Sequence, residues 1–205
     1  MVSFPINKKT VFLAAFLATA VLHAGMIWKK SSSPDELSYE LKRDNGYYIL
    51  EASLPIASGP GCLLEVIYSP YHMRKLMRKD ADALEILKET PASYELRSVH
   101  KNKICLLDTV YRRELLKENM RVGFELVKCE QKGKVAPQLV SSEGYYEVRP
   151  ETGGSRLYYY EKTKLETGRW DPRALALVKV VERDTLMFLK KLKKYSEQTA
   201  CRTPS

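Results

Sequence analysis

The stretch Ser141–Leu165, SSEGYYEVRPETGGSRLYYYEKTKL, predicts two long β-strands joined by a tight turn. A four-residue loop at 151–154 would place a glycine at the positive-φ position that such turns need. One face of the hairpin then carries Pro150 with Ser155, Val148 with Leu157 and Tyr146 with Tyr159. The other face carries Arg149 with Arg156, Glu147 with Tyr158 and Tyr145 with Tyr160.

The tyrosines of this hairpin are therefore divided between two faces. They do not form one exposed stacking platform, so we expect no nucleic-acid partner. The face that holds Tyr146 and Tyr159 either lines a ligand pocket or makes ordinary cross-strand aromatic contacts; the sequence leaves both open.

Short strands and turns extend on both sides of the hairpin. The alternation of apolar and polar residues predicts seven strands, at 47–55, 84–90, 93–101, 103–115, 120–129, 138–149 and 155–166. Most of the connections are short, which favours an antiparallel meander. Two short helices, divided at Pro70, follow the first strand.

One long helix closes the chain. Asp171 is a suitable N-cap and Pro172 a suitable first helical residue. An apolar stripe follows at Leu175, Val178, Val181, Leu186, Leu189 and Leu192. Only this helix is long enough to cover a seven-stranded sheet, and it cannot fill the whole concave surface. We therefore expect an α+β fold with a cavity between a curved sheet and the C-terminal helix.

This order of elements resembles the START-like helix-grip superfamily (SRPBCC), which includes polyketide cyclases and aromatases, coenzyme-Q-binding proteins and lipid-transfer START domains. The resemblance rests on LLEVIYSPYHMRKLM at 63–77 and GYYEVRPETGGSRLYYYEKTKL at 144–165, and it covers residues 40–198. It implies a helix-grip domain that binds, shields or transfers a lipid, isoprenoid or polycyclic compound. The superfamily has no strict catalytic motif, so the resemblance is more specific for fold than for function.

Residues 1–30 differ from the rest of the chain. Lys8 and Lys9 precede an apolar run, 11–28, which Lys29 and Lys30 close. This pattern predicts an N-terminal apolar helix that is either a cleaved signal peptide or a retained membrane anchor. We expect a linker at 31–38 and the helix-grip domain at 39–200, exported and either membrane-anchored, periplasmic or secreted.

The net charge of +9 is concentrated at the two ends of the chain. Residues 1–30 hold four lysines and no acid, and the segment from Pro172 onward has eight basic residues against three acids. The middle of the chain is close to neutral, which argues against a nucleic-acid-binding face. The basic residues Lys190, Lys191, Lys193 and Lys194 are either a solvated face or a contact with anionic lipid headgroups.

The predicted hairpin 103–129 gives a second test of strand register. Folding it about Lys117 places Phe124 opposite Val110, Leu126 opposite Asp108 and Val122 opposite Arg112. The same register places Cys105 opposite Cys129, which makes a cross-strand disulfide feasible. Cys62 and Cys201 would then remain for the other disulfide, a pairing for which the sequence offers no geometric argument; buried reduced thiols are the alternative.

These registers define the candidate ligand-binding residues on the concave face: Leu106, Asp108, Val110, Arg112, Phe124, Tyr146, Tyr159, Val178 and Val181. Asp108 and Arg112 would pair with each other or bind the polar end of a ligand, because buried charges need partners. The alternative is that the strand which carries them has its inside and outside reversed.

No catalytic motif, metal-ligand spacing or phosphate-binding loop occurs in the sequence, so we name no catalytic residue and expect no metal and no cofactor. Binding of a hydrophobic ligand is the main hypothesis. A cofactor-independent cyclase or hydrolase would need Asp108, Arg112 or His100 to converge in the cavity. A protein-interaction module without a ligand would have an interior filled by its own side chains.

Overall fold

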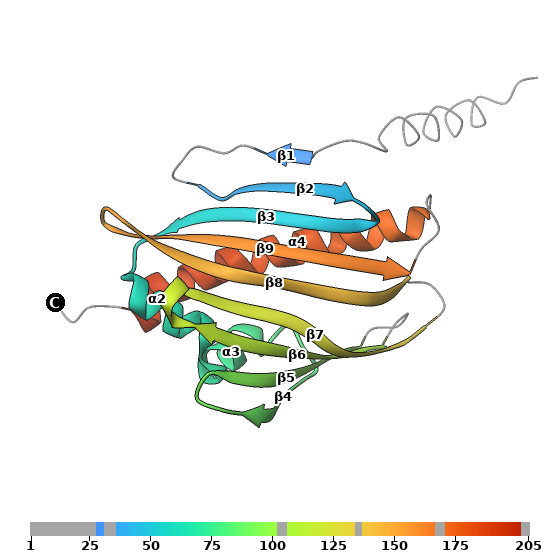
Figure 1. The fold of residues 1–205 in the computed structure, drawn as a ribbon, viewed down its shortest axis with the longest axis horizontal. Helices are drawn as coiled ribbons and strands as arrows, with labels where there is room; N and C mark the ends of the chain where they lie inside the picture. The colour runs from blue at the N-terminus through green and yellow to red at the C-terminus, as the bar shows by residue number, and fades with distance from the viewer. Residues whose placement is uncertain (1–27, 31–35, 102–105, 134–136, 167–170, 202–205) are drawn as a thin grey trace, which may run out of the picture.

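The protein is described by a computed structural model over residues 28–30, 36–101, 106–133, 137–166 and 171–201 (Figure 1). In these ranges it forms one antiparallel sheet of nine strands in the order β1-β2-β3-β9-β8-β7-β6-β5-β4. The strands are β1 (Trp28–Lys30), β2 (Ser38–Asp44), β3 (Tyr47–Ile56), β4 (Ala83–Glu89), β5 (Ser93–Lys101), β6 (Leu106–Leu116), β7 (Arg121–Lys132), β8 (Gln138–Glu151) and β9 (Gly154–Glu166).

Three α-helices accompany the sheet: α2 (Pro60–Tyr68), α3 (Pro70–Met77) and α4 (Pro172–Tyr195). Each begins with a proline at its first turn, where a missing N–H is harmless. Asp171 caps α4 as predicted, because its Oδ1 accepts a hydrogen bond from the Arg173 backbone N–H at 2.9 Å. Figure 1 shows α4 running along one face of the sheet, behind β3 and β9.

All seven predicted strands and all three helices downstream of residue 40 are present. The sheet is wider than predicted because β1 and β2 extend its edge beyond β3. The β2–β3 connection is a tight turn in which Asn45 (φ 48°) and Gly46 (φ 82°) both have positive φ. Residues 28–30, which precede the predicted linker at 31–38, pair with β2.

The predicted N-terminal apolar run, 11–28, lies outside the described residues except for Trp28, which belongs to β1. Among the residues that are described, no helix is both long and apolar enough to cross a membrane.

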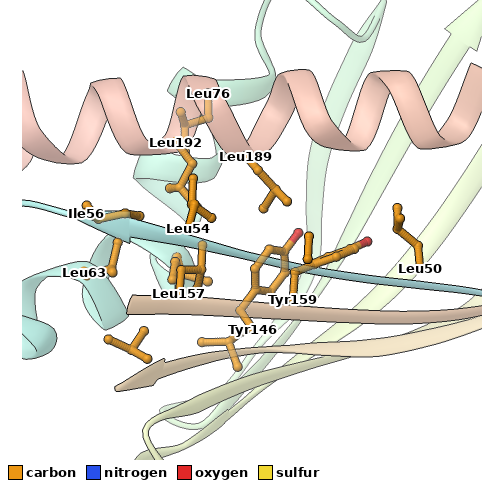
Figure 2. Packing of buried hydrophobic residues seen from close by; sticks show 14 of the residues in the cluster. Leu50, Leu54, Ile56, Leu63, Leu76, Tyr146, Leu157, Tyr159, Leu189 and Leu192 are labelled. Atoms are coloured by element: carbon orange, nitrogen blue, oxygen red, sulfur yellow. The ribbon is translucent and has the colours of Figure 1, made fainter. Parts of the chain in front are cut away.

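The main hydrophobic core lies between α4, the sheet and the two short helices. Leu189 and Leu192 of α4 are 0 % and 1 % exposed. Figure 2 shows them facing buried side chains of the sheet, α2 and α3, namely Leu54, Ile56, Leu63, Leu76 and Leu157. Burial of this kind stabilises a protein by about 1.5–3 kcal/mol per large aliphatic side chain.

The buried stripe of α4 differs in part from the predicted one. The residues that face the core are Ala174, Val178, Glu182, Leu189 and Leu192, whereas Leu175 is 55 % and Val181 is 37 % exposed. The helical period explains the difference, because the row 174, 178, 182 advances by four residues and the predicted row advanced by three. Val181 is therefore not an inward-facing residue.

The C-terminal end of α4 is attached to the rest of the domain by several specific contacts. Cys201, just beyond the helix, forms a disulfide with Cys62 of α2. A hydrogen bond of 2.8 Å joins His72 Nδ1 of α3 to Tyr195 Oη. The Ala57 backbone N–H donates to the Glu197 carboxylate at 2.8 Å. These contacts hold the last turns of α4 against α2, α3 and the end of β3.

Candidate functional site

The β8–β9 hairpin places an aromatic cluster on the sheet face that is turned toward α4, which we call the inner face. The hairpin has the predicted register, with Tyr146 opposite Tyr159, and Gly153 adopts the predicted positive φ of 82°. The two tyrosine rings lie 5.0 Å apart, centroid to centroid. Phe124 of β7 stacks on Tyr159 at 5.9 Å, and Tyr111 of β6 meets Phe124 edge-on at 6.2 Å.

Burial divides this aromatic cluster into a covered and a partly open part. Tyr146 and Tyr159 are 7 % and 5 % exposed, whereas Tyr111 and Phe124 are half-buried. Burial raises the pKa of Tyr146 to about 12, so its phenol is neutral across the physiological range. Phe124 and the ring of Tyr111 therefore keep some exposed aromatic surface, although burial raises the pKa of the Tyr111 hydroxyl.

A carboxylate borders the aromatic cluster on β9. Glu161 accepts three side-chain hydrogen bonds, from Tyr159 Oη at 2.6 Å, Ser142 Oγ at 3.0 Å and Thr163 Oγ1 at 3.1 Å. Burial raises the pKa of Tyr159, and the neighbouring Glu161 charge raises it further. This acidic side of the cluster is thus well supplied with donors.

A buried guanidinium borders the cluster on the opposite side. Arg113 of β6 is 6 % exposed and lies over the Tyr146 ring at 5.3 Å. Its Nη2 donates to the Ile67 carbonyl oxygen near the C-terminus of α2 at 2.9 Å, a position where the helix dipole favours a cation. No carboxylate among the described residues pairs with it.

Two buried atoms at this point, Arg113 Nε and the hydroxyl oxygen of Tyr94, form no well-aligned hydrogen bond among the described residues. The Arg113 guanidinium nevertheless interacts with the Tyr94 and Tyr146 phenols, and this contact works against the rise that burial causes in the pKa of each. Tyr94 is 1 % exposed and is the cross-strand partner of Arg113 in the β5–β6 ladder. A buried donor without a partner costs about 1–3 kcal/mol. Arg113 and Tyr94 are the site residues that the sequence reasoning missed, and the correct β6 register would have found them.

The β6–β7 hairpin has a different register from the predicted one. The short 3-10 helix η1 (Lys117–Asn119) closes it, and Phe124 lies opposite Arg113 instead of Val110. A register shift by an odd number of residues turns every side chain of one strand to the opposite face. The predicted pair Asp108 and Arg112 is consequently on the outer face, together with Leu106 and Val110.

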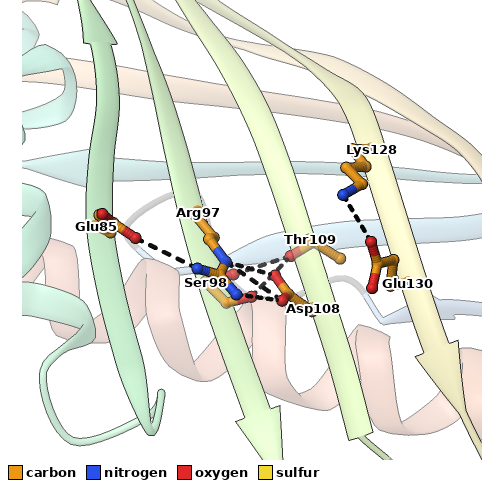
Figure 3. A network of polar contacts seen from close by, with 7 residues as sticks. All are labelled: Glu85, Arg97, Ser98, Asp108, Thr109, Lys128 and Glu130. Carbon is orange, nitrogen blue, oxygen red and sulfur yellow. Dashed lines mark hydrogen bonds and ion pairs between the residues drawn. The ribbon is translucent and has the colours of Figure 1, made fainter.

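Outer-face contacts satisfy these charges. Arg97 Nη2 binds Asp108 Oδ2 at 2.6 Å, part of a polar network that Figure 3 shows across β4, β5, β6 and β7. Arg112 Nη1 binds Glu125 Oε1 at 2.7 Å. Val110 is 6 % exposed, with Arg97 and Lys128 as its cross-strand neighbours.

Of the nine predicted ligand-binding residues, the structure places four on the inner side: Phe124, Tyr146, Tyr159 and Val178. Asp108, Arg112 and His100 do not converge, because the first two point outward and His100 Nδ1 contacts the Asp80 carbonyl oxygen at 2.8 Å. No group of metal-binding side chains was found among the described residues.

Three of the four cysteines lie within the described residues. The Cys62–Cys201 disulfide is present. Cys129 lies opposite Thr109 in the β6–β7 ladder, so the register that suggested a bond to Cys105 is wrong. Cys105 itself lies outside the described residues, and its pairing stays a prediction.

Two surface depressions lie away from the aromatic cluster. One, of about 360 Å³, lies between Tyr39 and the outer side of α4. The other, of about 430 Å³, lies between α3 and the start of β4.

Comparisons with known proteins identify similar structures but no similar curated sequence. No protein-family model and no curated protein matches the chain. A STAR-related lipid transfer protein from Xanthomonas axonopodis superposes with a TM-score of 0.61 at 18 % identity, over 84 % of this chain and 99 % of that one. An aromatase/cyclase from Streptomyces sp. R1128 has a TM-score of 0.58 at 13 % identity, over 77 % and 99 % of the two chains.

A protein from Thermus thermophilus gives a TM-score of 0.58 at 19 % identity, over 71 % of this chain and 94 % of that one. At such identities the similarity shows a shared fold, and the residues of the site must supply the argument for function.

Proposed function

We propose that this chain, which has the START-like helix-grip fold of the SRPBCC superfamily, binds a hydrophobic ligand with one polar end between the inner face and α4. The observation that carries the proposal is the pairing of half-buried aromatic surface, at Tyr111 and Phe124, with the buried polar groups of Arg113 and Tyr94. These two groups contact each other, but Arg113 Nε and the Tyr94 hydroxyl form no well-aligned hydrogen bond among the described residues. Two similar structures are named as a lipid transfer protein and an aromatase/cyclase, which supports a ligand of this general kind.

The apolar part of the ligand would supply most of the binding free energy. Burying a chain of ten methylenes contributes roughly 8 kcal/mol before the costs of ordering and association. Few specific polar contacts are then needed, and their main effect is to fix the orientation of the ligand.

The polar end of the ligand should accept hydrogen bonds. Arg113 Nε and Tyr94 Oη lie on adjacent strands and each has a donor to offer. A carboxylate, phosphate or carbonyl group would satisfy both donors and, if anionic, would also balance the Arg113 charge. We propose that the protein binds and shields the ligand. The residues that a cyclase or hydrolase would have needed, Asp108, Arg112 and His100, do not converge.

An exported location is part of the proposal. The Cys62–Cys201 disulfide supports it, because such bonds persist in oxidising compartments. The apolar run at 11–28 supports it from the sequence. Fractionation of the host cells tests the location, and recovery of the protein with a reduced Cys62 from the cytosol would contradict it.

The binding proposal is tested by native mass spectrometry of the full chain purified from its own host, followed by extraction and identification of bound molecules. The expected result is a co-purifying lipid, isoprenoid or polycyclic compound with a polar end. A protein that carries nothing, and takes up neither fatty acids nor sterols, would contradict the proposal and favour an interaction module.

Two variants test the polar end. Tyr94→Phe removes a hydroxyl whose contact with Arg113 is poorly aligned, so we expect little change in stability without ligand but weaker retention of the ligand. Tyr145→Phe on the outer face is its matched control. Arg113→Met should release the ligand, whereas Arg112→Met, one residue away and outward, should not. Equal ligand retention in Tyr94→Phe and Tyr145→Phe would refute the role of Tyr94.

A further inference from the structure

The outward side of α4 combines exposed apolar side chains with basic ones. Val180 and Met187 are 43 % and 55 % exposed, and Leu175 at the rim of this side is 55 % exposed. Arg173, Arg183, Lys190 and Lys194 lie on the same side, at the helical spacing 173, 176, 180, 183, 187, 190, 194. We call this set of apolar and basic residues the outer face of α4.

The charges of the helix favour an anionic partner for this face. Between Pro172 and Tyr195 the helix has seven Lys or Arg residues and two acids. One acid, Glu182, is 7 % exposed, points to the core side and pairs with Lys179 at 2.5 Å. The other, Asp184, pairs with its neighbour Arg183.

The ion pairs of α4 determine which of the C-terminal lysines are free to contact an anionic partner. Lys191 binds Asp80 at 2.9 Å, and Lys193 binds Glu197 at 3.1 Å and also contacts the Pro55 carbonyl oxygen. These two side chains are used within the domain, whereas Lys190 and Lys194 are exposed and have no ion pair among the described residues. Of the four lysines that the sequence offered for contact with lipid headgroups, only Lys190 and Lys194 are therefore available to a partner.

The depression of about 360 Å³ lies beside the same face. It is lined by Tyr39 of β2 and by α4 through the apolar Leu186 and Met187 and the charged Lys179, Glu182, Arg183 and Lys190, so apolar side chains meet three basic groups and one acid. Burial raises the pKa of the Tyr39 phenol, and the adjacent Glu182 carboxylate raises it further, so this ring stays neutral.

We propose that the outer face of α4 docks on an anionic membrane surface, with the helix axis parallel to the bilayer. From residue 173 to 194 this face is about 33 Å long. Val180, Met187 and Leu175 would enter the headgroup region while the basic side chains contact lipid phosphates, the arrangement typical of interfacial helices. The proposal goes beyond ligand binding and does not depend on it.

The test is lysine footprinting by acetylation and mass spectrometry on the full chain, with vesicles of pure phosphatidylcholine or of phosphatidylcholine mixed with phosphatidylglycerol. Because labelling is measured for each lysine separately, attachment of the protein to vesicles through residues 1–30 would not by itself produce the protection expected at α4. We expect labelling of Lys190 and Lys194 to fall severalfold with the anionic vesicles only. Lys79 and Lys117, exposed elsewhere, are the internal controls.

High salt and sequence variants provide two further tests of the proposed docking. The protection should disappear near 1 M salt, where the Debye length is about 3 Å. The Val180→Ser/Met187→Ser variant should lose protection of Lys190, whereas Val127→Ser/Val140→Ser, with exposed valines of the sheet, should keep it. Lys190→Gln/Lys194→Gln should lower vesicle affinity roughly thirtyfold.

Three results would overturn the proposal: no change in labelling, equal protection by neutral vesicles, or equal protection of all four lysines. The first would leave an acidic protein surface as the occupant to test next. A protein that fails to bind any hydrophobic ligand but still protects Lys190 and Lys194 would refute the proposed function and leave this inference intact.

Discussion

Replacement of Gly144 by alanine should strongly destabilise the protein. Gly144 lies in β8 between Phe124 of β7 and Glu161 of β9. A Cβ at this position would overlap the Tyr160 backbone oxygen and come within 2.5 Å of Phe124 Cζ. The oxygen belongs to the β8–β9 ladder and the ring is stacked on Tyr159, so neither can move without loss of contacts.

The magnitude follows from these two overlaps. Insertion of one carbon into a well-packed site costs about 1–3 kcal/mol, and a clash with backbone belongs at the upper end. Gly123 provides a matched control on the neighbouring strand, because a Cβ there has no atom within 4 Å. Gly123→Ala should be neutral or stabilise by about 0.5–1 kcal/mol, since glycine is unfavourable within a strand.

Urea denaturation of both variants measures the difference. We expect a lower midpoint for Gly144→Ala at an unchanged slope, and an unchanged or higher midpoint for Gly123→Ala. Near-ultraviolet circular dichroism should show a disturbed aromatic cluster only in the first variant. If the two variants unfold at the same urea concentration, the proposed close approach of Phe124 to the β8 backbone is wrong.

Two further predictions concern the attachment of α4. The disulfide closes a loop with a sequence separation of 139, for which the chain-entropy relation gives a stabilisation of about 5 kcal/mol. Cys62→Ala/Cys201→Ala should therefore lower the free energy of unfolding by about 2–5 kcal/mol. A loss below about 1 kcal/mol in urea denaturation would contradict this prediction. Burial lowers the pKa of His72, so the folded state prefers the neutral ring; stability should be complete above the ordinary value of 6.5 and decrease as the pH falls below it. Thermal unfolding from pH 8 to 5 should show this slope, and His72→Gln should reduce it; an unchanged slope would exclude His72 as its source.

The parts of the fold that were predicted correctly depend on local signals. The β8–β9 register follows from one Gly-containing turn and long flanking strands, so a four-residue loop determines every pair from Tyr146–Tyr159 to Pro150–Ser155. The starts of α3 and α4 follow from Pro70 and from Asp171 with Pro172, because these residues act within one helical turn.

The edge of the sheet was missed although a local signal was present. Asn45-Gly46 is the preferred dipeptide for a two-residue hairpin turn, and it predicts a strand on each side of itself. Only the strand after it, β3, was predicted. The strand before it, β2, carries Tyr39, which borders the depression beside α4.

The inside and outside of β6 were reversed because the loop at Lys117 was counted wrongly. The true register places opposite charges across the outer face, with Arg112 opposite both Glu125 and Glu95. The predicted register instead placed Arg112 opposite Val122, so charge complementarity between strands would have favoured the true one. The true register would have turned Arg113 to the inner face, but its contact with the Ile67 carbonyl oxygen was not predictable, because that atom belongs to α2.

The proposed ligand site and the proposed membrane surface lie on opposite sides of α4, so the contacts of this helix bear on both. Its C-terminal end is joined to the domain by the disulfide, by Tyr195 and by Glu197. The ion pairs described for its N-terminal half, such as Lys179–Glu182, lie within the helix or its cap. The inner side of that half covers the sheet with small side chains, Ala174 and Val178, while its outer side presents Val180 and Met187. A membrane that binds Val180 and Met187 on the outer side would therefore contact a part of the helix whose inner side packs on the sheet through small side chains.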